Sequence, residues 1–463
     1  MNCVAIEATI HGGFLLAESG RQQRLRNDCV GYAVTLPIMK NTCLTLFVAS
    51  FVLLFASSQF TVAQDENWSR FRGNNGVGVS EARIPANWTK DSYRWQIDLP
   101  GTGHGSPAVW GNRIFLNAAD VKGRQRLFVC IAADSGKILW QRKYKADTHK
   151  KHKSNSYATV TPAVDEKHVY TAWDNGGNII LTALAHDGSN AWSSDLGKVK
   201  GGHGFGVSPS VVGDLVILPN DQDGSSSLIA VNRDTGKIVW NIPRNSLRLT
   251  YSVPCLFEYE GAKPQLIFTN WHHGITGVDH MAGKVLWELD VFGKPDKERA
   301  IGSPVIAGDL IIGTCGFVTK KKHVVAIRPA GVNGAKESKE IWRIERSVPH
   351  IPTLLVEDER VWLWDDLGVI TLLNRRDGEV IYRARIEGVA EKFFASPVYA
   401  GGVIFNVSAN GKVVAIDAGD VFKQLASNDL KEKAQATPAI ANGDMFIRTF
   451  SKLVCVKGLT KVN

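Results

Sequence analysis

The sequence has little of what most enzyme and membrane classes require. It contains no Gly-rich phosphate-binding loop, no nucleophile elbow and no His-Glu-x-x-His segment. Its main apolar run, residues 42–56, is too short to span a bilayer comfortably. Seven cysteines among 463 residues show no framework spacing, and stretches with a helical period are few. These absences argue against a membrane-embedded protein and a disulfide scaffold, and they favour an all-β class.

What the chain does contain is a repeated dipeptide. A Ser-Pro pair or a close relative, followed by an apolar residue, occurs eight times, and successive copies lie 41 to 55 residues apart. A period of roughly 40–50 residues is typical of propeller blades, each a small four-stranded sheet. The copies centre on Pro107, Pro162, Pro209, Pro254, Pro304, Pro352, Pro397 and Pro438. The repeat therefore predicts an all-β fold, an eight-bladed β-propeller of four-stranded antiparallel blades.

The first repeat shows how one blade is built. Segments rich in apolar and β-branched residues at 106–109, 113–116, 127–132 and 138–140 are separated by Gly, Asn and Asp turn residues. We name the four expected strands A, B, C and D in chain order. In this order the D–A connections and the B–C loops share one face of the ring, whereas the tight A–B and C–D turns share the other.

A large aromatic residue follows the C–D turn at a fixed offset in most repeats. Because glycine supplies the positive φ of the turn, we expect the next aromatic side chain to pack between neighbouring blades. These blade-docking residues are Trp140, Trp192, Trp240, Trp287 and Trp342.

Trp95 has the same context but precedes the first Ser-Pro copy, and the last repeat ends without a D strand. We therefore expect residues 93–98 to supply the outer strand of the last blade. This closure leaves no open sheet edge between the first and last blades. It predicts a propeller domain over residues 93–463, preceded by an N-terminal extension over 64–92.

The N-terminus has the pattern of an export signal. Residues 39–63 begin with Met39-Lys40-Asn41, continue through the apolar run and end in small residues before Gln64. This pattern predicts a signal peptide cut after Ala63 and a periplasmic or secreted protein without a membrane span after cleavage. Residues 1–38 would form an unusually long n-region, so we expect translation to begin at Met39.

Four cysteines lie beyond the predicted signal peptide, namely Cys130, Cys255, Cys315 and Cys455. An oxidising destination permits disulfides, but cysteine within strands is more often a small buried hydrophobe. We expect buried thiols, and the disulfide state stays open.

The formal net charge is +9, with lysine-rich patches at 145–153 and 320–322 in expected loops. Nucleic acid would require basic residues interleaved with aromatic residues on one face. The patches instead fit solvated loops, so we expect a monomer with no nucleic-acid partner.

Functional residues should gather on the face that carries the D–A and B–C loops, because loops on a rigid scaffold commonly form binding sites. The D–A candidates are His104, Asn155, Tyr157, His203, Phe205 and His350, and the B–C candidates are Trp173, Asp174, Trp271, His272, Trp364 and Asp365. Asp221, Asp223 and Asn410 on the same loops are ordinary turn residues. Histidines that converge on the channel could bind a transition metal, but no ligand spacing can be checked across blades, and we predict no metal site.

The run Ala133 to Trp140 and its repeats resemble the tryptophan-docking motif of quinoprotein-type propellers. That family includes the pyrroloquinoline quinone (PQQ) dehydrogenases and non-catalytic relatives such as the outer-membrane-protein assembly lipoprotein. The segment Trp68-Ser69-Arg70-Phe71-Arg72-Gly73, with Gly76 and Gly78, resembles a leader found on secreted propellers of planctomycete-type bacteria.

The resemblance implies two functions from different classes. The first is a non-catalytic binding or scaffold module that presents its loops to a periplasmic or cell-envelope protein or glycan. The second is a PQQ-dependent dehydrogenase, in which Trp271 or Trp364 would stack on the quinone and Asp365 or Asp366 would lie near calcium. The adjacent cysteines of the dehydrogenases and the Cys-x-x-Cys-His haem motif are both absent. These departures favour the first function.

Overall fold

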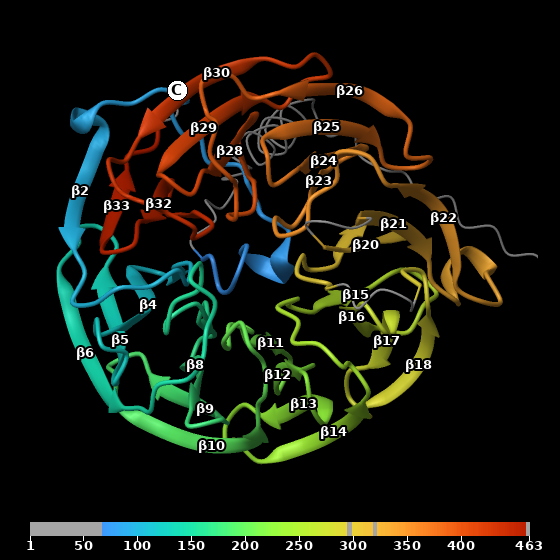
Figure 1. Ribbon diagram of the computed structural model, residues 1–463, viewed down its shortest axis with the longest axis horizontal. Helices are drawn as coiled ribbons and strands as arrows, with labels where there is room; N and C mark the ends of the chain where they lie inside the picture. Colours follow the sequence, from blue (N-terminus) through green and yellow to red (C-terminus); the bar gives the residue numbers. More distant parts are fainter. Residues whose placement is uncertain (1–66, 294–298, 318–321, 460–463) are drawn as a thin grey trace, which may run out of the picture. The chain divides into compact units, whose positions relative to one another are not determined.

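The computed structural model describes residues 67–293, 299–317 and 322–459. Within the unit Ala63–Asn463, eight antiparallel sheets stand side by side in a ring around a central channel (Figure 1). Seven of these sheets have four strands, and the eighth gains a short fifth strand. The eight-bladed all-β fold predicted from the Ser-Pro repeat is confirmed. The predicted signal peptide, residues 39–63, and the segment 1–38 lie outside the described residues.

Each of the first four blades runs from an inner strand at the channel to an outer strand at the rim. Their strands are β3 (Ala108–Trp110), β4 (Arg113–Ala119), β5 (Gln125–Ala132), β6 (Ile138–Lys145); β7 (Ala163–Val164), β8 (His168–Asn175), β9 (Asn178–Ala185), β10 (Asn190–Lys198); β11 (Ser210–Val212), β12 (Leu215–Asn220), β13 (Ser226–Asn232), β14 (Ile238–Arg244); β15 (Cys255–Phe257), β16 (Gln265–Asn270), β17 (Gly274–Asp279), β18 (Lys284–Leu289).

The remaining blades follow the same order. Their strands are β19 (Val305–Ala307), β20 (Leu310–Gly316), β21 (Lys322–Arg328), β22 (Lys339–Ile344); β23 (Leu355–Glu357), β24 (Arg360–Trp364), β25 (Val369–Asn374), β26 (Val380–Arg385); β27 (Val398–Ala400), β28 (Val403–Val407), β29 (Lys412–Asp417), β30 (Gln424–Asp429); β31 (Ala439–Ala441), β32 (Asp444–Arg448), β33 (Lys452–Val456). The 3₁₀ helices of the described residues are η1 (Asn74–Gly76), η2 (Lys90–Ser92) and η3 (Val332–Gly334).

An N-terminal strand closes the ring. β2 (Tyr93–Asp98) pairs antiparallel with β33 and becomes the outer strand of the last blade, with Trp95 opposite Cys455. Arg94 forms an ion pair with Asp444 of β32 at 2.6 Å, which ties the same strand to the blade by charge. The predicted closure by residues 93–98 is therefore confirmed.

The docking tryptophans join each blade to the next. The indole Nε1 of Trp95, Trp140, Trp192, Trp240 and Trp342 donates to a backbone carbonyl in the C–D turn of the following blade, at 2.8–2.9 Å. Gly283 shows why that turn needs glycine, because a Cβ there would lie 2.4 Å from Cγ of Trp240 at a φ of +63°. Trp287 differs, since its Nε1 donates to the Gln265 side chain within its own blade.

The segment of residues 67–80, called here the plug segment, runs through the middle of the ring among the inner strands (Figure 1, blue). It contacts the inner strands of several blades in turn: Trp68 pairs with Val109 of β3, and Arg70 donates to the Pro254 carbonyl at 2.7 Å. It ends in β1 (Val79–Ser80), which pairs parallel with β27. The motif that begins at Trp68 and ends at Gly78 is thus part of the propeller core.

Ser-Pro residues link the inner strands into a ring of hydrogen bonds. At six blade junctions a backbone N–H at the start of one inner strand donates to a Ser or Thr hydroxyl of the next blade at 2.9–3.1 Å. The acceptors, called here the hydroxyl ring, are Thr161, Ser208, Ser303, Thr353, Ser396 and Thr437. The hydroxyl accepts from the buried backbone N–H of a residue next to proline, which would otherwise lack a partner. Proline itself has no N–H to contribute. This explains why the repeat selects hydroxyl residues beside proline.

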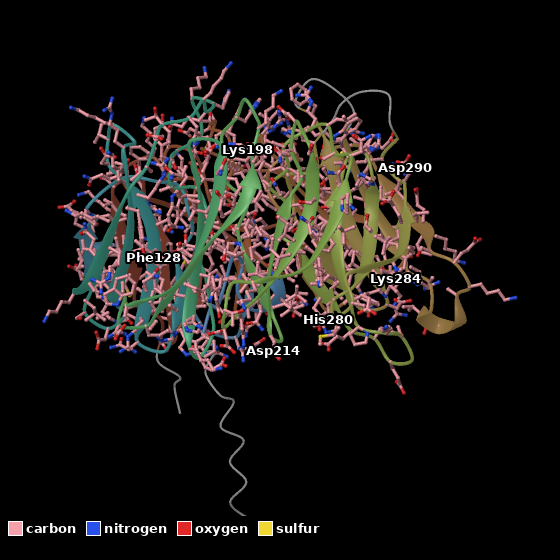
Figure 2. All side chains as sticks on the ribbon, turned by 90° about the horizontal axis from the view of Figure 1, so that it is seen from below. Phe128, Lys198, Asp214, His280, Lys284 and Asp290 are labelled. Carbon is pink, nitrogen blue, oxygen red and sulfur yellow. The ribbon has the colours of Figure 1, made fainter. Side chains whose placement is uncertain are left out.

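The two faces of the propeller differ (Figure 2). Lys198 at the end of β10 and Asp290 after β18 mark the face of the D–A and B–C loops, which we call the loop face. Asp214 and His280, in an A–B and a C–D turn, mark the opposite turn face. Asn67 of the plug segment accepts a hydrogen bond from Gly111 in an A–B turn, so the plug segment enters from the turn face.

All four cysteines beyond the predicted signal peptide are buried. Cys130, Cys255 and Cys455 are free thiols, and burial raises the pKa of Cys130 and Cys255 to about 12. Among the helices of the described part of the chain, none has the length and apolar character needed to cross a bilayer.

Candidate functional site

A cavity of about 560 Å³ lies where the channel opens among the D–A segments. Its walls include residues of the hydroxyl ring, among them Thr161, Ser208, Ser396 and Thr437, and Phe71 of the plug segment also lines it. A void of this size suits a small-molecule ligand, since such pockets commonly measure roughly 300–1,000 Å³.

The charged groups of the cavity wall are all of one sign. Its cationic or basic residues are Arg299, Lys153, Lys392, His104, His152, His203 and His350. None of the described residues that line the cavity is Asp or Glu. The cavity therefore concentrates positive potential in a partly desolvated space, where charges are poorly screened.

Arg299 is the most unusual of these groups. The residue is only 3% exposed. Its guanidinium donates to the Leu249 carbonyl at 3.3 Å and to Nδ1 of His203 at 3.2 Å. Its Nε has no hydrogen-bond partner. Burial lowers the pKa of this guanidinium, which retains its charge without a contacting carboxylate in the described chain.

The hydrogen bond from Arg299 fixes the state of His203. Because a guanidinium can only donate, Nδ1 of His203 must accept, and the proton of the neutral ring resides on Nε2. Burial and the nearby Arg299 lower the pKa of His203. His152 stacks on this ring with centroids 5.2 Å apart and planes inclined by 13°. The pair thus presents two imidazoles from adjacent D–A segments.

His104 and His350 are neutral imidazoles held in the wall. Burial lowers the pKa of His104 to about 3, with Arg448 adding to the effect. Burial likewise lowers the pKa of His350 to about 4, against the opposing influence of Asp366. His350 is 6% exposed, and neither of its ring nitrogens has a hydrogen-bond partner.

Four of the site residues expected from the sequence line this cavity, namely His104, Asn155, His203 and His350. Asn155 also shapes it, because its Nδ2 donates to the His203 carbonyl at 2.8 Å and thereby joins two D–A segments.

A second group surrounds a much smaller void of about 20 Å³, and comprises Tyr157, Trp173, Asp174 and Phe205. The ring of Tyr157 lies 4.9 Å from the Arg126 guanidinium, and Asp174 lies 3.5 Å from His149. Oδ1 of Asp174 also accepts from the Gly177 backbone at 2.7 Å, as a turn residue does. This group lies beside the cavity, since Thr159 lines both voids, but none of its four residues lines the cavity itself.

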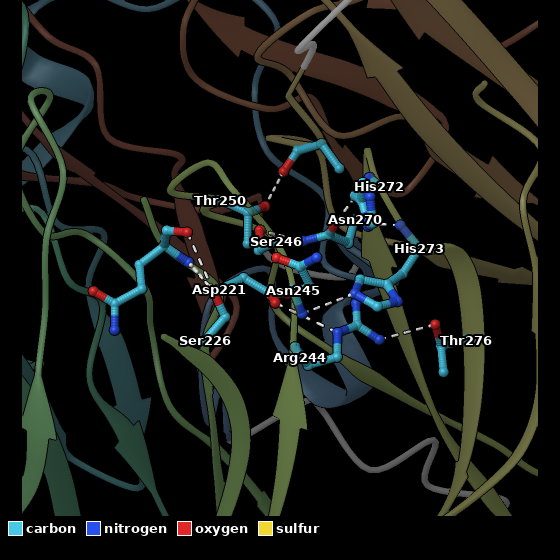
Figure 3. Close-up of polar contacts among 12 residues, drawn as sticks. Asp221, Ser226, Arg244, Asn245, Ser246, Thr250, Asn270, His272, His273 and Thr276 are labelled. Carbon is cyan, nitrogen blue, oxygen red and sulfur yellow. Dashed lines mark hydrogen bonds and ion pairs between the residues drawn. The ribbon is translucent and has the colours of Figure 1, made fainter. Parts of the chain in front are cut away.

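Trp271 and His272 belong to a polar network at the loops of β14 and β16. Trp271 is buried, and its Nε1 donates to the Ser246 carbonyl at 2.6 Å. Asn270 accepts from the backbone of His272 at 2.8 Å and donates to the Ser246 hydroxyl at 2.7 Å (Figure 3).

The same network contains the ion pair of Arg244 with Asp221, 3.4 Å apart and almost fully buried. These contacts give the loop its shape, and neither Trp271 nor His272 lines the cavity.

Trp364 and Asp365 also contact residues of their own blade. Trp364 has no exposed surface and packs against Phe393 with centroids 5.3 Å apart. Oδ1 of Asp365 accepts from the backbones of Leu367 and Val369 at 2.8 Å each. Both residues therefore stabilise the B–C turn of β24 and β25, away from the cavity.

Several lining residues were not expected from the sequence, namely Arg299, Tyr251, Lys153 and Lys392. Arg299 and Lys392 each precede a Ser-Pro proline by five residues. They lie in D–A connections, the kind of connection that carries His104 and His203 in other blades. Charge in the D–A connections was the signal that could have identified them. Within the described ranges, no three His, Cys, Asp or Glu side chains gather closely enough to hold a metal ion.

Comparisons with known proteins agree with the fold. Residues 89–253 and 366–461, together more than half of the chain, match the family described as outer membrane protein assembly factor BamB. A search of curated proteins finds no match.

Among solved structures, BamB from Moraxella catarrhalis is 15% identical with a TM-score of 0.55, covering 80% of this chain and 97% of that one. A quinohemoprotein alcohol dehydrogenase from Comamonas testosteroni is 13% identical with a TM-score of 0.58, covering 86% and 82%. The computationally designed Ika8 protein is 11% identical with a TM-score of 0.53, covering 78% and 98%. At such identities these structures share the fold only. By its family match, the chain belongs to the PQQ-repeat β-propellers of the BamB family.

Proposed function

We propose that this protein is a non-catalytic binding module of the cell envelope that acts through its loop face. The observation that carries the proposal is the cavity on that face, which is preformed, basic and free of carboxylates among the described residues that line it. The family is described as an outer membrane protein assembly factor, so we propose an envelope protein as the partner.

The alternative of a PQQ-dependent dehydrogenase with calcium fits the residues poorly. Calcium takes six to eight oxygen ligands, usually including carboxylates. The candidate ligands are committed elsewhere: Asp365 to its turn, and Asp366 to the backbones of His350 and Ile351 and to Lys322 at 3.0 Å. Trp271 and Trp364, the candidates for stacking on the quinone, are buried away from the cavity. We therefore assign no step to a quinone or a calcium ion.

The proposed location rests on the export pattern of residues 39–63. Mass spectrometry of the mature N-terminus should show Gln64 as the first residue. A product that retains residues 42–56 would contradict release from the membrane.

The partner face can be tested with two matched lysines. Lys198 lies on the loop face and Lys284 beside a C–D turn of the opposite face, and both side chains are exposed (Figure 2). Replacing each in turn with a photoreactive benzophenone amino acid should give, in intact cells, a discrete cross-linked envelope protein from position 198 only. The proposal fails if position 284 gives the same product, or if the purified protein reduces a dye in the presence of PQQ and calcium.

A further inference from the structure

We propose that the loop-face cavity binds a small multivalent oxyanion, a molecule that carries two or more carboxylate or phosphate groups. The inference rests on the proposed function in that it treats this cavity as a binding site, and it adds the chemical class of the ligand.

The first argument is charge. Arg299 is 97% buried, and its hydrogen-bond partners among the described residues, the Leu249 carbonyl and His203, include no carboxylate. Burial lowers the pKa of its guanidinium, although Tyr251 and Asp223 nearby oppose that shift. A charge taken out of water without a counter-charge is costly, and an entering anion would offset that cost. Lys153 and Lys392 line the same cavity and add to the attraction.

The second argument is the supply of unused donors. Nε of Arg299 is buried without a hydrogen-bond partner, and so are both ring nitrogens of His350, of which the neutral ring offers one as a donor. The proton on Nε2 of His203 follows from the Arg299 contact with Nδ1. Oxyanions are the ligands that satisfy several convergent donors at once, and guanidinium binds them in a bidentate manner.

The third argument is the remainder of the wall. Hydroxyls of the hydroxyl ring, such as Thr161 and Ser208, line the cavity, and they can donate to oxygen atoms. A volume of about 560 Å³ exceeds what a single inorganic ion requires, so a larger anion with several acidic groups fits better. A neutral sugar would leave Arg299 uncompensated, and a cation would be repelled.

Isothermal titration of the mature protein tests the inference with three probes. Citrate represents the carboxylates, pyrophosphate the phosphates, and glucose is the neutral control. We expect citrate, pyrophosphate or both to bind, glucose not to bind, and binding to weaken as salt rises. The stronger of the two anions identifies the acidic group. Equal binding of glucose, or no binding of either anion at millimolar concentration, would overturn the inference.

Two variants localise the binding. Arg299→Gln should weaken anion binding at least tenfold, whereas Arg126→Gln, the same change at another buried arginine that does not line the cavity, should leave it unchanged. If Arg299→Gln does not fold, His350→Gln should also weaken binding. Undiminished binding in a folded Arg299→Gln or His350→Gln protein would place the anion elsewhere and refute the inference.

The two proposals fail separately. A cross-link from position 198 without anion binding would support the proposed binding module and refute only the oxyanion inference. If the protein binds the anion and also reduces dye with PQQ and calcium, the oxyanion inference stands and the non-catalytic function is refuted.

Discussion

Two buried arginines in the same channel have opposite surroundings. Arg72 of the plug segment has no exposed surface and donates five hydrogen bonds at 2.9–3.1 Å, to the carbonyls of Gly76, Val77, Thr353, Leu354 and Pro397. Arg299 at the loop-face end donates two hydrogen bonds within the described ranges, lies beside Tyr251 and leaves Nε without a partner. All five N–H donors of a guanidinium are thus used in the first case and not in the second.

The difference separates a structural charge from one available to a ligand. The plug segment is built around Arg72, since a Cβ on Gly78 would lie 2.6 Å from Nη2 of Arg72. Carbonyls from three chain segments surround that guanidinium and spread its charge. Nothing comparable surrounds Arg299, and this contrast is the basis for the oxyanion inference.

The largest expected effect is that of Arg72→Ala on stability. Several buried carbonyls would lose their donor at once, at about 1–3 kcal/mol each, so we expect a loss of roughly 3–6 kcal/mol in the free energy of unfolding. Arg72→Lys should recover only part of it, because a lysine cannot reach all five acceptors. Arg299→Gln should change stability by less than about 1 kcal/mol, since it removes an uncompensated charge.

Denaturant unfolding measures these differences. The contrast between the two arginines breaks down if Arg72→Ala is as stable as the parent, or if Arg299→Gln is destabilised as much as Arg72→Ala.

The docking tryptophans show how much free energy of unfolding a single contact between blades contributes. Trp240 is 8% exposed and donates across the blade junction to the His280 carbonyl at 2.9 Å, so Trp240→Ala should cost about 3–5 kcal/mol. Trp287 donates within its own blade and is half-buried, so Trp287→Ala should cost less. Equal midpoints for Trp240→Ala and the parent would refute the role of these residues in blade docking.

The sequence was sufficient for the fold because a propeller is a periodic object. Eight Ser-Pro copies gave the number of blades, and the missing D strand after Val456 gave the closure. The periodic pattern also placed the faces, since the strand order alone decides which connections lie together.

The candidate site was predicted only in part, because a loop's position does not fix where its side chains point. Trp271 follows strand β16 and Trp364 is the last residue of β24, and both indoles are buried, with Trp271 donating to the Ser246 carbonyl. Apolar side chains gain more free energy in the blade interior than at a wet channel mouth. Arg299 was missed for a related reason, because burial of an unpaired arginine depends on tertiary contacts that no local pattern records.

A smaller effect concerns pH and the histidines of the cavity. In the folded protein burial lowers the pKa of His104 to about 3 and that of His350 to about 4, whereas an exposed histidine has a pKa of 6.5. Below pH 6.5 the unfolded chain therefore binds protons that the folded chain does not, and stability should fall as pH falls towards 4.

His350 makes this testable. Burial is the main cause of its lowered pKa, Asp366 opposes the shift, and Lys322, Arg299 and His203 add to it. Between pH 6.5 and 5, His350→Gln should reduce the slope of the free energy of unfolding against pH, by up to about 1.4 kcal/mol per pH unit. An unchanged slope would mean that His350 takes up protons equally in both states.

Hydrogen exchange measured by mass spectrometry, with and without the preferred anion, tests most directly the claim that the two channel ends differ. We predict that residues 67–80 are strongly protected in both conditions, because the plug segment is already satisfied by the inner strands. The D–A segments around His152, His203 and Arg299 should gain protection only when the anion is present. An anion-dependent change in the plug segment without one in these D–A segments would contradict the account.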